Sequence, residues 1–414
     1  MNHCTLIFDI GKTNKKLIVF NRVYKIVYHE SIQFTEVVDD DGYPCEDLNS
    51  LLNWIEERLK FLMNNPKFSI NRVNFSTYGA SWVHLDNTGN PITPLYNYLK
   101  PFPEALKEQF DTRYDLNQVT GETGSPYDGM LNSGLQLYCL RHAKPELWDK
   151  IGCSLHLPQY LSYYFTGERW SDYPSIGCHT MLWDYQKKDY HTWVRQEGIY
   201  EKLAPIRTQP TNVQRHWRGV ELTFGHGVHD SSAALSVYLQ KSVEPFILLS
   251  TGTWCVAMNP FVEFKENSGS KFKGGLFYLT PDGKPVKATR LFLGNELAEK
   301  TKTLVEKFGG PANEGYSMPF NQDAFDKAQS SAFKPETLNF EQAYHKLIWG
   351  LVQKQVKAIE EARSDSQIRR LYVDGGFAKN EVFIKMLEYA LYDWTVTVSE
   401  NPEGTAMGAA LLLD

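Results

Sequence analysis

Leu6–Phe20 reads LIFDIGKTNKKLIVF, in which two apolar runs flank a short polar insert. The apolar runs predict two strands, and the insert predicts a tight turn between them. Gly11 lets the backbone come close to a bound group, so the N–H groups of this turn can converge on an anion. Thr13 adds a hydroxyl, and Lys16 or Lys15 can neutralise the charge of a phosphate. A solvated hairpin tip is the alternative interpretation.

Two further residues complete the predicted phosphate site at this bend. Asp9 ends the first strand, and its carboxylate can hold Mg²⁺ directly or through water, because Mg²⁺ prefers oxygen ligands and keeps several waters. Asn14 follows Thr13 in the bend and is included among the predicted phosphate contacts. In the alternative interpretation, Asp9 only caps a solvated turn.

Composition and charge argue against several classes of protein. The 414-residue chain is long enough for two or three domains, and 42% of its residues are apolar. Its formal charge of −6 gives no overall attraction to nucleic acid or to an anionic membrane. No run approaches the roughly 20 apolar residues that span a bilayer, and the N-terminus lacks a signal-peptide pattern, so we expect a cytoplasmic protein. The six cysteines contain no CxxC pair, which disfavours a zinc ribbon and favours reduced thiols.

The same order of predicted elements occurs twice along the chain. Three strand-like runs, a helix with apolar residues at helical spacing and a fourth strand occupy residues 5–79. The second series begins at EPFILLSTGTWCVAMNP, residues 244–260, continues to a long amphipathic helix at residues 340–363 and ends in the strand IRRLYVDGG. The duplication predicts two similar α/β domains, residues 1–241 and 242–414, that face a cleft.

The second series carries a turn like that of Leu6–Phe20. STGTW, Ser250–Trp254, lies between two apolar strands at the equivalent place. Thr251, Gly252 and Thr253 therefore form a second predicted phosphate loop. Two such loops, one from each domain, can hold one polyphosphate from opposite sides, and the matched pair is stronger evidence than either turn alone.

The segment VDGGFAKN predicts a nucleotide site. Gly375 and Gly376 follow a strand and precede a helix, so the backbone can lie flat against a base or a ribose. Asn380, near the start of that helix, can hydrogen-bond the nucleoside. A strand-to-helix turn with positive φ also explains the glycines. The small-residue helix at Gly404–Leu413 permits close packing beside this site, although core packing alone also explains it.

Asp230 is the candidate general base. In GHGVHDSSAALSVYL it comes at the predicted N-terminus of a helix, whose dipole favours an ionised carboxylate. There it can accept the proton of a substrate hydroxyl that attacks a γ-phosphate. Helix capping is the alternative role. His226 and His229 lie nearby, but the segment lacks further ligands at a spacing that would indicate a metal site.

Tyr78, Trp82 and His84 alternate along a predicted strand or bend. Aromatic surface with polar tips on one face is suited to the C–H faces and hydroxyls of a sugar. Asp230 would complete this predicted sugar site. Strand alternation into the core is the other explanation of the pattern.

These motifs, in this order, resemble those of the FGGY family of carbohydrate kinases, within the actin/hexokinase/Hsp70 ATPase superfamily. DIGKTNKK is similar to the family's first phosphate motif, HDSSAAL to its catalytic-aspartate segment, STGTW to its second phosphate motif and VDGGFAKN to its adenosine motif. STYGASWVHLDNTGNPITPLYNY is similar to the sugar-pocket segment of the rhamnulokinase and fuculokinase branch. The resemblance implies an α/β fold of two duplicated actin-like, ribonuclease H-like domains around a central cleft. Lys12 and Ser81 depart from the family pattern, which leaves the identity of the sugar open.

The resemblance implies an ATP-dependent kinase that uses Mg²⁺ to phosphorylate a hydroxyl of a small sugar, typically a ketose such as L-rhamnulose, L-fuculose or xylulose. Asp230 would be the base, Asp9 the carboxylate on the magnesium side and Lys16 a phosphate contact. A regulatory protein of the same fold that binds sugar or nucleotide without turnover is the alternative, and an actin- or Hsp70-like ATPase is another. The expected partner is a small sugar, with neither nucleic acid nor membrane. The oligomeric state stays open, with a homodimer as one alternative.

Overall fold

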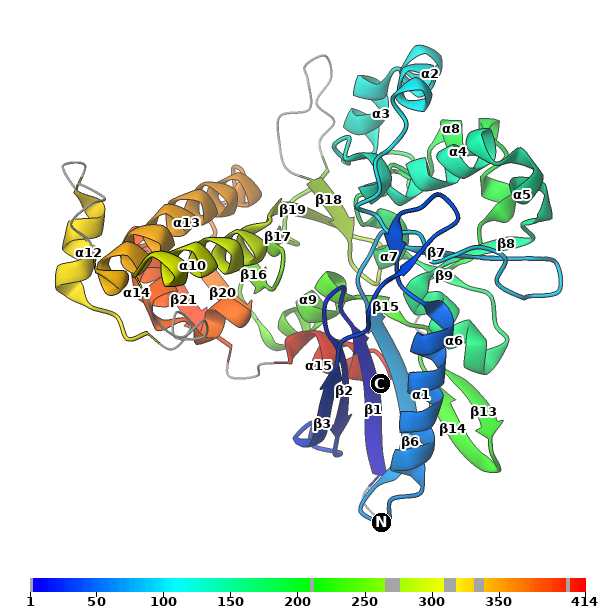
Figure 1. Ribbon diagram of the computed structural model, residues 1–414, viewed down its shortest axis with the longest axis horizontal. Helices are drawn as coiled ribbons and strands as arrows, with labels where there is room; N and C mark the ends of the chain where they lie inside the picture. Colours follow the sequence, from blue (N-terminus) through cyan, green and yellow to red (C-terminus); the bar gives the residue numbers. More distant parts are fainter. Residues whose placement is uncertain (1–2, 209–211, 265–275, 309–317, 331–338, 400–402) are drawn as a thin grey trace. The chain divides into compact units, whose positions relative to one another are not determined.

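The computed structural model describes residues 3–208, 212–264, 276–308, 318–330, 339–399 and 403–414 (Figure 1). The chain divides into two compact units. The first contains Met1–Gln240, Glu263–Pro285 and Thr405–Asp414, and the second contains Lys241–Val262 and Val286–Gly404. The first change of unit lies one residue from the predicted domain boundary, and two later segments of the chain return to the first unit.

The first unit contains the elements drawn in blue to green up to residue 240 in Figure 1, together with the strand at residues 276–279 and the C-terminal helix. Its described strands are β1 (His3–Ile10), β2 (Lys15–Phe20), β3 (Ile26–Ile32), β4 (Val37–Val38), β5 (Pro44–Cys45), β6 (Ser69–Thr77), β7 (Trp82–Leu85), β8 (Cys153–His156), β9 (Ser171–Asp172), β10 (Trp183–Asp184), β11 (Asp189–Tyr190), β12 (Ile206–Arg207), β13 (Val213–Trp217), β14 (Val220–Phe224), β15 (Val228–His229) and β18 (Leu276–Leu279). Its described α-helices are α1 (Leu48–Met63), α2 (Glu104–Tyr114), α3 (Leu116–Glu122), α4 (Ser133–Ala143), α5 (Pro145–Lys150), α6 (Leu157–Thr166), α7 (Tyr173–Gly177), α8 (Thr192–Gln196), α9 (Asp230–Lys241) and α15 (Gly404–Leu411).

The second unit has fewer described elements. Its strands are β16 (Ile247–Thr251), β17 (Cys255–Asn259), β19 (Pro285–Leu291), β20 (Arg370–Gly375) and β21 (Thr395–Val398). Its α-helices are α10 (Leu293–Phe308), α12 (Gln322–Gln329), α13 (Phe340–Arg363) and α14 (Glu381–Ala390). The long helix predicted at residues 340–363 is confirmed, and Asn339 caps it with a reciprocal hydrogen bond to Gln342.

The main sheets of the two units share one topology. In the first unit, β3, β2 and β1 are antiparallel neighbours, and β6 lies parallel to β1 and to β14 and β15. In the second unit, β19, β17 and β16 are antiparallel neighbours, and β20 lies parallel to β16 and β21. The predicted β-β-β-α-β order is thus found along the main sheet of the first unit, whereas in the second unit α10 and α12 also lie between β19 and α13.

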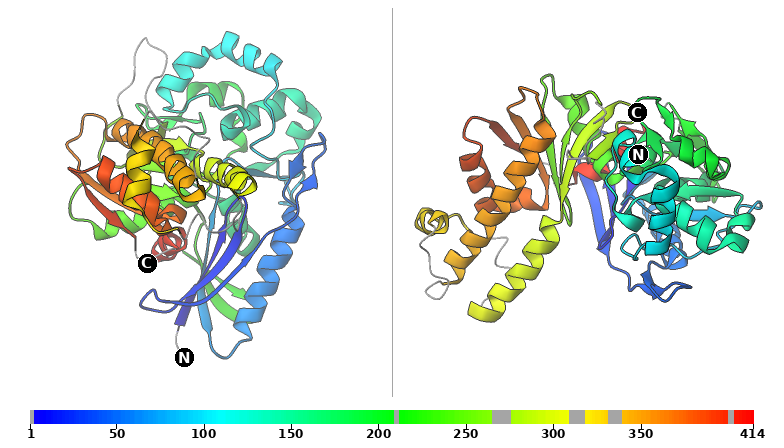
Figure 2. Two further views of the ribbon diagram at one scale, coloured as in Figure 1. Left: turned by 60° about the vertical axis from the view of Figure 1, so that its left-hand side comes forward. Right: turned by 90° about the horizontal axis from the view of Figure 1, so that it is seen from above.

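Amphipathic helices cover these sheets. The residues of α1 at helical spacing, among them Leu51, Ile55 and Leu59, are buried against β1, β2 and β6. In the second unit, α10 and α13 lie side by side and share a core with β16 and β20 (Figures 1 and 2). Among the described residues, no helix combines the length and the apolar character needed to cross a bilayer.

Most of the longer elements between the two series are helices. Helices α2 to α5, α7 and α8 contribute to an aromatic core that includes Tyr138 and Trp193. Residues 133–151 form two helices, because Pro145 starts α5 after α4 has ended at Ala143.

Candidate active site

Three strands of the first unit end at one edge of its sheet, and they carry the predicted catalytic residues. β1 and β15 both run parallel to β6, where Ser76 lies opposite Asp9 on one side and opposite Val228 on the other. Asp9 and Val228 therefore lie at the same height in the sheet on either side of β6, separated by two strand spacings, or about 10 Å. Asp230 follows shortly after Val228, so the β1–β2 bend and Asp230 lie at the same carboxyl edge.

The β1–β2 bend is closed by a hydrogen bond of 2.9 Å from the Gly11 N–H to the Asn14 carbonyl oxygen. A Cβ at Gly11 would lie 2.9 Å from that oxygen, so a larger residue would crowd the turn. Thr13 and Asn14 are exposed, and the Asn14 side-chain oxygen accepts from Gln33 Nε2 at 2.7 Å. The bend thus has the glycine and the exposed polar groups of a phosphate loop, and phosphate binding stays a prediction.

Strand alternation separates the two lysines that follow the bend. Lys15 is 2% exposed on the face that packs against α1, where its ammonium pairs with the buried Glu46 carboxylate. It also donates to the Lys12 carbonyl oxygen at 3.0 Å. Lys16 lies opposite Asp9 in the β1–β2 register, so the two side chains share the other face of the sheet. Because Lys15 is committed to Glu46, Lys16 is the better candidate to neutralise a phosphate.

Tyr78 lies apart from the other two predicted sugar contacts. Its hydroxyl donates to Glu46 Oε2 at 2.8 Å, and its ring packs 6.0 Å from the ring of Tyr98. It belongs to the core that β1, β2 and α1 form, whereas Trp82 belongs to the core of the helical segment. Ala80, with a φ of 57°, turns the chain between them.

Trp82 and His84 share one face of β7, with ring centroids 6.5 Å apart. The Trp82 ring also stacks on His156 at 3.6 Å, and His84 Nδ1 lies 2.8 Å from Ser154 Oγ. Burial lowers the pKa of His84 to about 3, so the ring is neutral at physiological pH. Core packing accounts for these contacts, and sugar binding by Tyr78, Trp82 and His84 stays a prediction.

Asp230 is the first residue of α9, as the sequence predicts, and its side chain is 34% exposed. Its Oδ1 accepts from the Ser231 backbone N–H at 2.6 Å and lies 3.1 Å from His229 Nε2. A partly exposed carboxylate at this edge of the sheet can take a proton from a bound hydroxyl. The role of general base stays a prediction.

The second predicted phosphate loop follows β16. Gly252 and Thr253 are exposed, whereas Thr251 is buried. The Thr251 hydroxyl donates to the Asp374 carbonyl oxygen and accepts from the Phe377 N–H at 3.0 Å. Thr251 therefore joins the end of β16 to the turn after β20, and phosphate contact by this loop stays a prediction.

Gly375→Ala should destabilise the second unit. Gly375 has a φ of +87°, and an added Cβ would lie 1.9 Å from the Thr251 carbonyl oxygen. The strained backbone alone costs about 1–3 kcal/mol, and the clash adds to this cost. We expect calorimetry to show a lower melting temperature for Gly375→Ala than for Gly376→Ala, because a Cβ at Gly376 would lie 3.9 Å from the same oxygen. Equal losses in the two variants would contradict this account.

The Asn380 side chain is fully engaged within the protein. Its Oδ1 caps α14 by accepting from the Phe383 N–H at 3.1 Å, and its Nδ2 donates to the Tyr344 hydroxyl at 2.8 Å. These contacts fit helix capping. Contact of Gly375, Gly376 and Asn380 with adenosine stays a prediction.

The sequence did not predict that Asp172 and His226 lie close together in the core. The two residues are far apart in the sequence, so only folding brings them together. Asp172 caps α7, and its Oδ1 accepts from the Ser175 N–H at 2.9 Å. Its Oδ2 lies 3.9 Å from His226 Nε2 and has no hydrogen-bond partner within the described part of the chain. Burial raises the pKa of Asp172 to about 6 and lowers the pKa of His226 to about 4.

Asp172→Asn should stabilise the protein above pH 6. The unfolded chain loses the Asp172 proton near pH 3.8, whereas the folded chain keeps it to about pH 6, so the carboxyl destabilises the fold increasingly as the pH rises between these values. The penalty approaches about 3 kcal/mol, and the Asn oxygen can still accept from Ser175. Urea unfolding of both chains at pH 4 to 8 should show the advantage of the variant growing with pH. An advantage that does not change with pH would contradict the assignment.

Two groups of side chains have the spacing of metal ligands among the described residues, and neither contains a predicted site residue. They are Glu122, Asp184 and His191, and the run Asp39, Asp40 and Asp41. Lys187 pairs with Asp184 at 2.7 Å, and Lys100 pairs with Asp39 at 2.8 Å. Because lysines already neutralise part of each group, we assign no metal to them.

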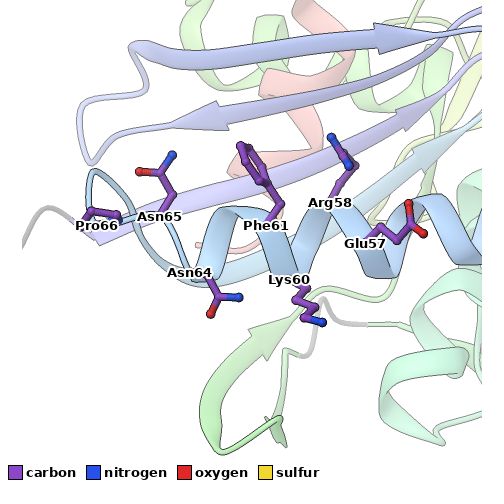
Figure 3. A pocket seen from close by; sticks show the side chains of 7 residues that line it. All are labelled: Glu57, Arg58, Lys60, Phe61, Asn64, Asn65 and Pro66. Carbon is purple, nitrogen blue, oxygen red and sulfur yellow. The ribbon is translucent and has the colours of Figure 1, made fainter.

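An open surface hollow of about 670 Å³ lies near the C-terminal end of α1 (Figure 3). It is lined by Glu57, Arg58, Lys60, Phe61, Asn64, Asn65 and Pro66. None of these belongs to the predicted phosphate, sugar or adenosine sites, so the hollow adds nothing to the candidate active site.

Comparisons with solved structures identify the fold. The chain resembles a carbohydrate kinase from Novosphingobium aromaticivorans with a TM-score of 0.80 and 22% identity, over 99% of this chain and 93% of that one. It resembles a xylulose kinase from Lactobacillus acidophilus with a TM-score of 0.81 and 14% identity, over 99% and 89% of the two chains. The predicted α/β class with duplicated actin-like domains is therefore confirmed.

Sequence comparisons find relatives among sugar kinases. A rhamnulokinase from Oceanobacillus iheyensis is 24% identical over 265 residues, which are 61% of this chain and span only 55% of the relative. An L-fuculokinase from Escherichia coli is 21% identical over 437 aligned positions, covering 98% of this chain and 91% of the relative. Residues 4–205 match the N-terminal domain of the FGGY family of carbohydrate kinases. The predicted resemblance to this family is therefore confirmed, through a match that covers just under half of the chain.

Proposed function

We propose that the chain is an ATP-dependent kinase that transfers the γ-phosphate to a hydroxyl of a small sugar, a ketose such as L-rhamnulose, L-fuculose or xylulose. One observation carries the proposal: the strand register brings Asp9, the β1–β2 bend and Asp230 to one edge of a single sheet. A phosphate loop, a carboxylate for a metal and a second carboxylate for a proton are the groups that phosphoryl transfer to a hydroxyl requires.

Asp230 acts as the base in this reaction. As the sugar oxygen forms its bond to the γ-phosphorus, the O–H proton passes to the Asp230 carboxylate, the bond from the γ-phosphorus to the bridging oxygen breaks and ADP leaves. Lys16 and the backbone N–H groups of the bend stabilise charge on the transferring group. Positioning and electrostatics supply most of the rate enhancement, because the protein forms no covalent bond.

Asp9 is the residue that would hold Mg²⁺. Its carboxylate is partly exposed at the end of β1, and oxygen donors of this kind suit the ion. The bound ion would neutralise phosphate charge.

The remaining predicted residues are assigned by the motifs to which they belong. Gly252 and Thr253 would contact phosphate through exposed groups. Gly375, Gly376 and Asn380 would border the adenosine. The sugar would contact Tyr78, Trp82 and His84. Support for these assignments comes from the order of the motifs.

The test is sugar-dependent release of ADP across a panel of ketoses that includes L-rhamnulose, L-fuculose and D- and L-xylulose. We expect one ketose to raise ADP release well above the rate with ATP alone. ATP binding by calorimetry without turnover of any sugar would favour the regulatory protein, and hydrolysis that ignores the sugar would favour an ATPase.

A further inference from the structure

The backbone of the β1–β2 bend accepts a hydrogen bond from a buried lysine. The Lys15 ammonium donates to the Lys12 carbonyl oxygen at 3.0 Å and also to the Glu46 carboxylate. Lys15 is 2% exposed and Glu46 is 7% exposed, so the ammonium cannot turn toward water without breaking this ion pair. The ammonium is therefore a fixed donor for the backbone of the bend.

The Glu46 carboxylate is itself held at both oxygens. Oε1 accepts from Lys15, and Oε2 accepts from the Tyr78 hydroxyl at 2.8 Å. The Tyr78 backbone N–H donates to the Ile10 carbonyl oxygen at 3.0 Å, at the end of β1. Glu46 comes between β5 and α1, and its backbone pairs with Leu95. The acceptor that holds Lys15 in place is thus fixed by two other segments of the first unit.

Two other side-chain contacts of the bend are more exposed. The Lys12 ammonium pairs with Glu36 at 2.8 Å, where the two side chains are 17% and 42% exposed. Gln33 Nε2 donates to the Asn14 side-chain oxygen at 2.7 Å, also at an exposed position. Exposed pairs contribute little, because water competes for the same groups. Of these three contacts, the hydrogen bond from Lys15 is the one that water replaces least readily.

The direction of the Lys12 carbonyl sets the direction of the next N–H group. In a planar trans peptide, the C=O of one residue and the N–H of the next residue point in opposite directions, and the described peptide bonds are all trans. Because the Lys12 carbonyl points to the buried ammonium of Lys15, the Thr13 N–H points away from it. Thr13 is exposed, so its N–H has the direction needed to receive a phosphate oxygen from outside the core.

We propose that Lys15 is a positioning residue for the phosphate bend: by holding the Lys12 carbonyl oxygen, it presents the Thr13 N–H to a phosphate of ATP. This inference rests on the proposed kinase function. Lys15 itself does not touch the substrate, because its ammonium is buried against Glu46. A bend that is already ordered binds phosphate without the cost of ordering it, so the effect belongs to the affinity for ATP.

The variant Lys15→Met/Glu46→Gln tests the proposal. It removes the donor to the Lys12 carbonyl without leaving an unpaired buried charge, and the Gln oxygen can still accept from Tyr78. We expect Kd for ATP, measured by calorimetry, to rise about 10-fold. The ratio kcat/KM for ATP should fall at least as far, because the same N–H also stabilises charge on the transferring group. The affinity for adenosine should not change, since adenosine has no phosphate to meet the bend.

A second variant and a control accompany this test. Lys15→Met/Glu46→Leu, with apolar residues at both positions, should show the same rise in Kd for ATP if the first variant does not fold. Lys202→Met is the matched control, because Lys202 also donates to a backbone carbonyl oxygen of the first unit, that of Ile151, at 2.5 Å. The control should bind ATP and adenosine as the unaltered chain does. The melting temperature establishes that each variant is folded.

The outcomes separate the positioning role from the proposed function. Unchanged ATP affinity in a folded double variant would overturn the positioning role and leave the ion pair as a stabilising contact only. Equal losses of affinity for ATP and adenosine would indicate a general distortion and would also overturn it. If the unaltered chain phosphorylates a ketose while the double variant binds ATP normally, only the positioning role is refuted. An unaltered chain that does not bind ATP would refute both proposals.

Discussion

Asp230→Asn lowers kcat by about 10²- to 10⁴-fold with the preferred ketose, while the affinity for ATP changes less than about 2-fold. The amide has the size of the carboxylate but cannot accept the proton of the attacking hydroxyl. Because the base acts in the chemical step, the loss should appear in kcat. Coupled ADP-release kinetics and calorimetric titration with ATP measure the two quantities.

Asp323→Asn serves as the control, since Asp323 is also an aspartate in the first turn of a helix and is exposed in the second unit. It should behave as the unaltered chain does. An Asp230→Asn variant that keeps more than a tenth of kcat would remove Asp230 from the mechanism and return it to helix capping. The position of Asp230 at the N-terminus of α9 is compatible with either result.

Glu46→Ala destabilises the first unit by about 3–5 kcal/mol, because it leaves the buried Lys15 ammonium without its carboxylate. Lys15 is 2% exposed and Glu46 is 7% exposed, so water cannot replace the lost partner well. The Tyr78 hydroxyl loses its acceptor at the same time. Calorimetry should show a large fall in the melting temperature of the first unit.

The double variant Lys15→Met/Glu46→Leu distinguishes the buried charge from lost packing. Replacing both partners with apolar residues removes the unpaired charge, so this chain should recover much of the stability that Glu46→Ala loses. A double variant as unstable as Glu46→Ala would show that the pair acts through shape. A loss below about 0.5 kcal/mol in Glu46→Ala would contradict the burial of the pair.

Local patterns were sufficient to predict two similar α/β domains, whereas the family resemblance supplied the actin-like fold. Alternating and continuous apolar runs predict strands, and helical spacing predicts α1 and α13, because these periods come from the geometry of a single element. The repeated order of elements then predicts two sheets of one topology, and the register of both sheets confirms it. Asp230 at the start of α9 follows from the small-residue run behind it.

Contacts between distant segments required the tertiary structure. The residues of the bend left open whether Lys16 or Lys15 meets the phosphate, and the family resemblance implied Lys16. The pairing of Lys15 with the buried Glu46 on one face of the sheet favours Lys16 on physical grounds. Asp172 and His226 carried no signal of their own, since burial from other segments produces their shifted pKa values.

The sequence by itself determined the order of elements, the duplication and the residue types that phosphate chemistry needs, since each is encoded in neighbouring residues. The tertiary structure decided which of those side chains are committed to the core and which remain exposed at the sheet edge. It also placed His229 Nε2 3.1 Å from one oxygen of Asp230. Burial and hydrogen-bond partners depend on segments brought together by folding, so a local pattern cannot contain them.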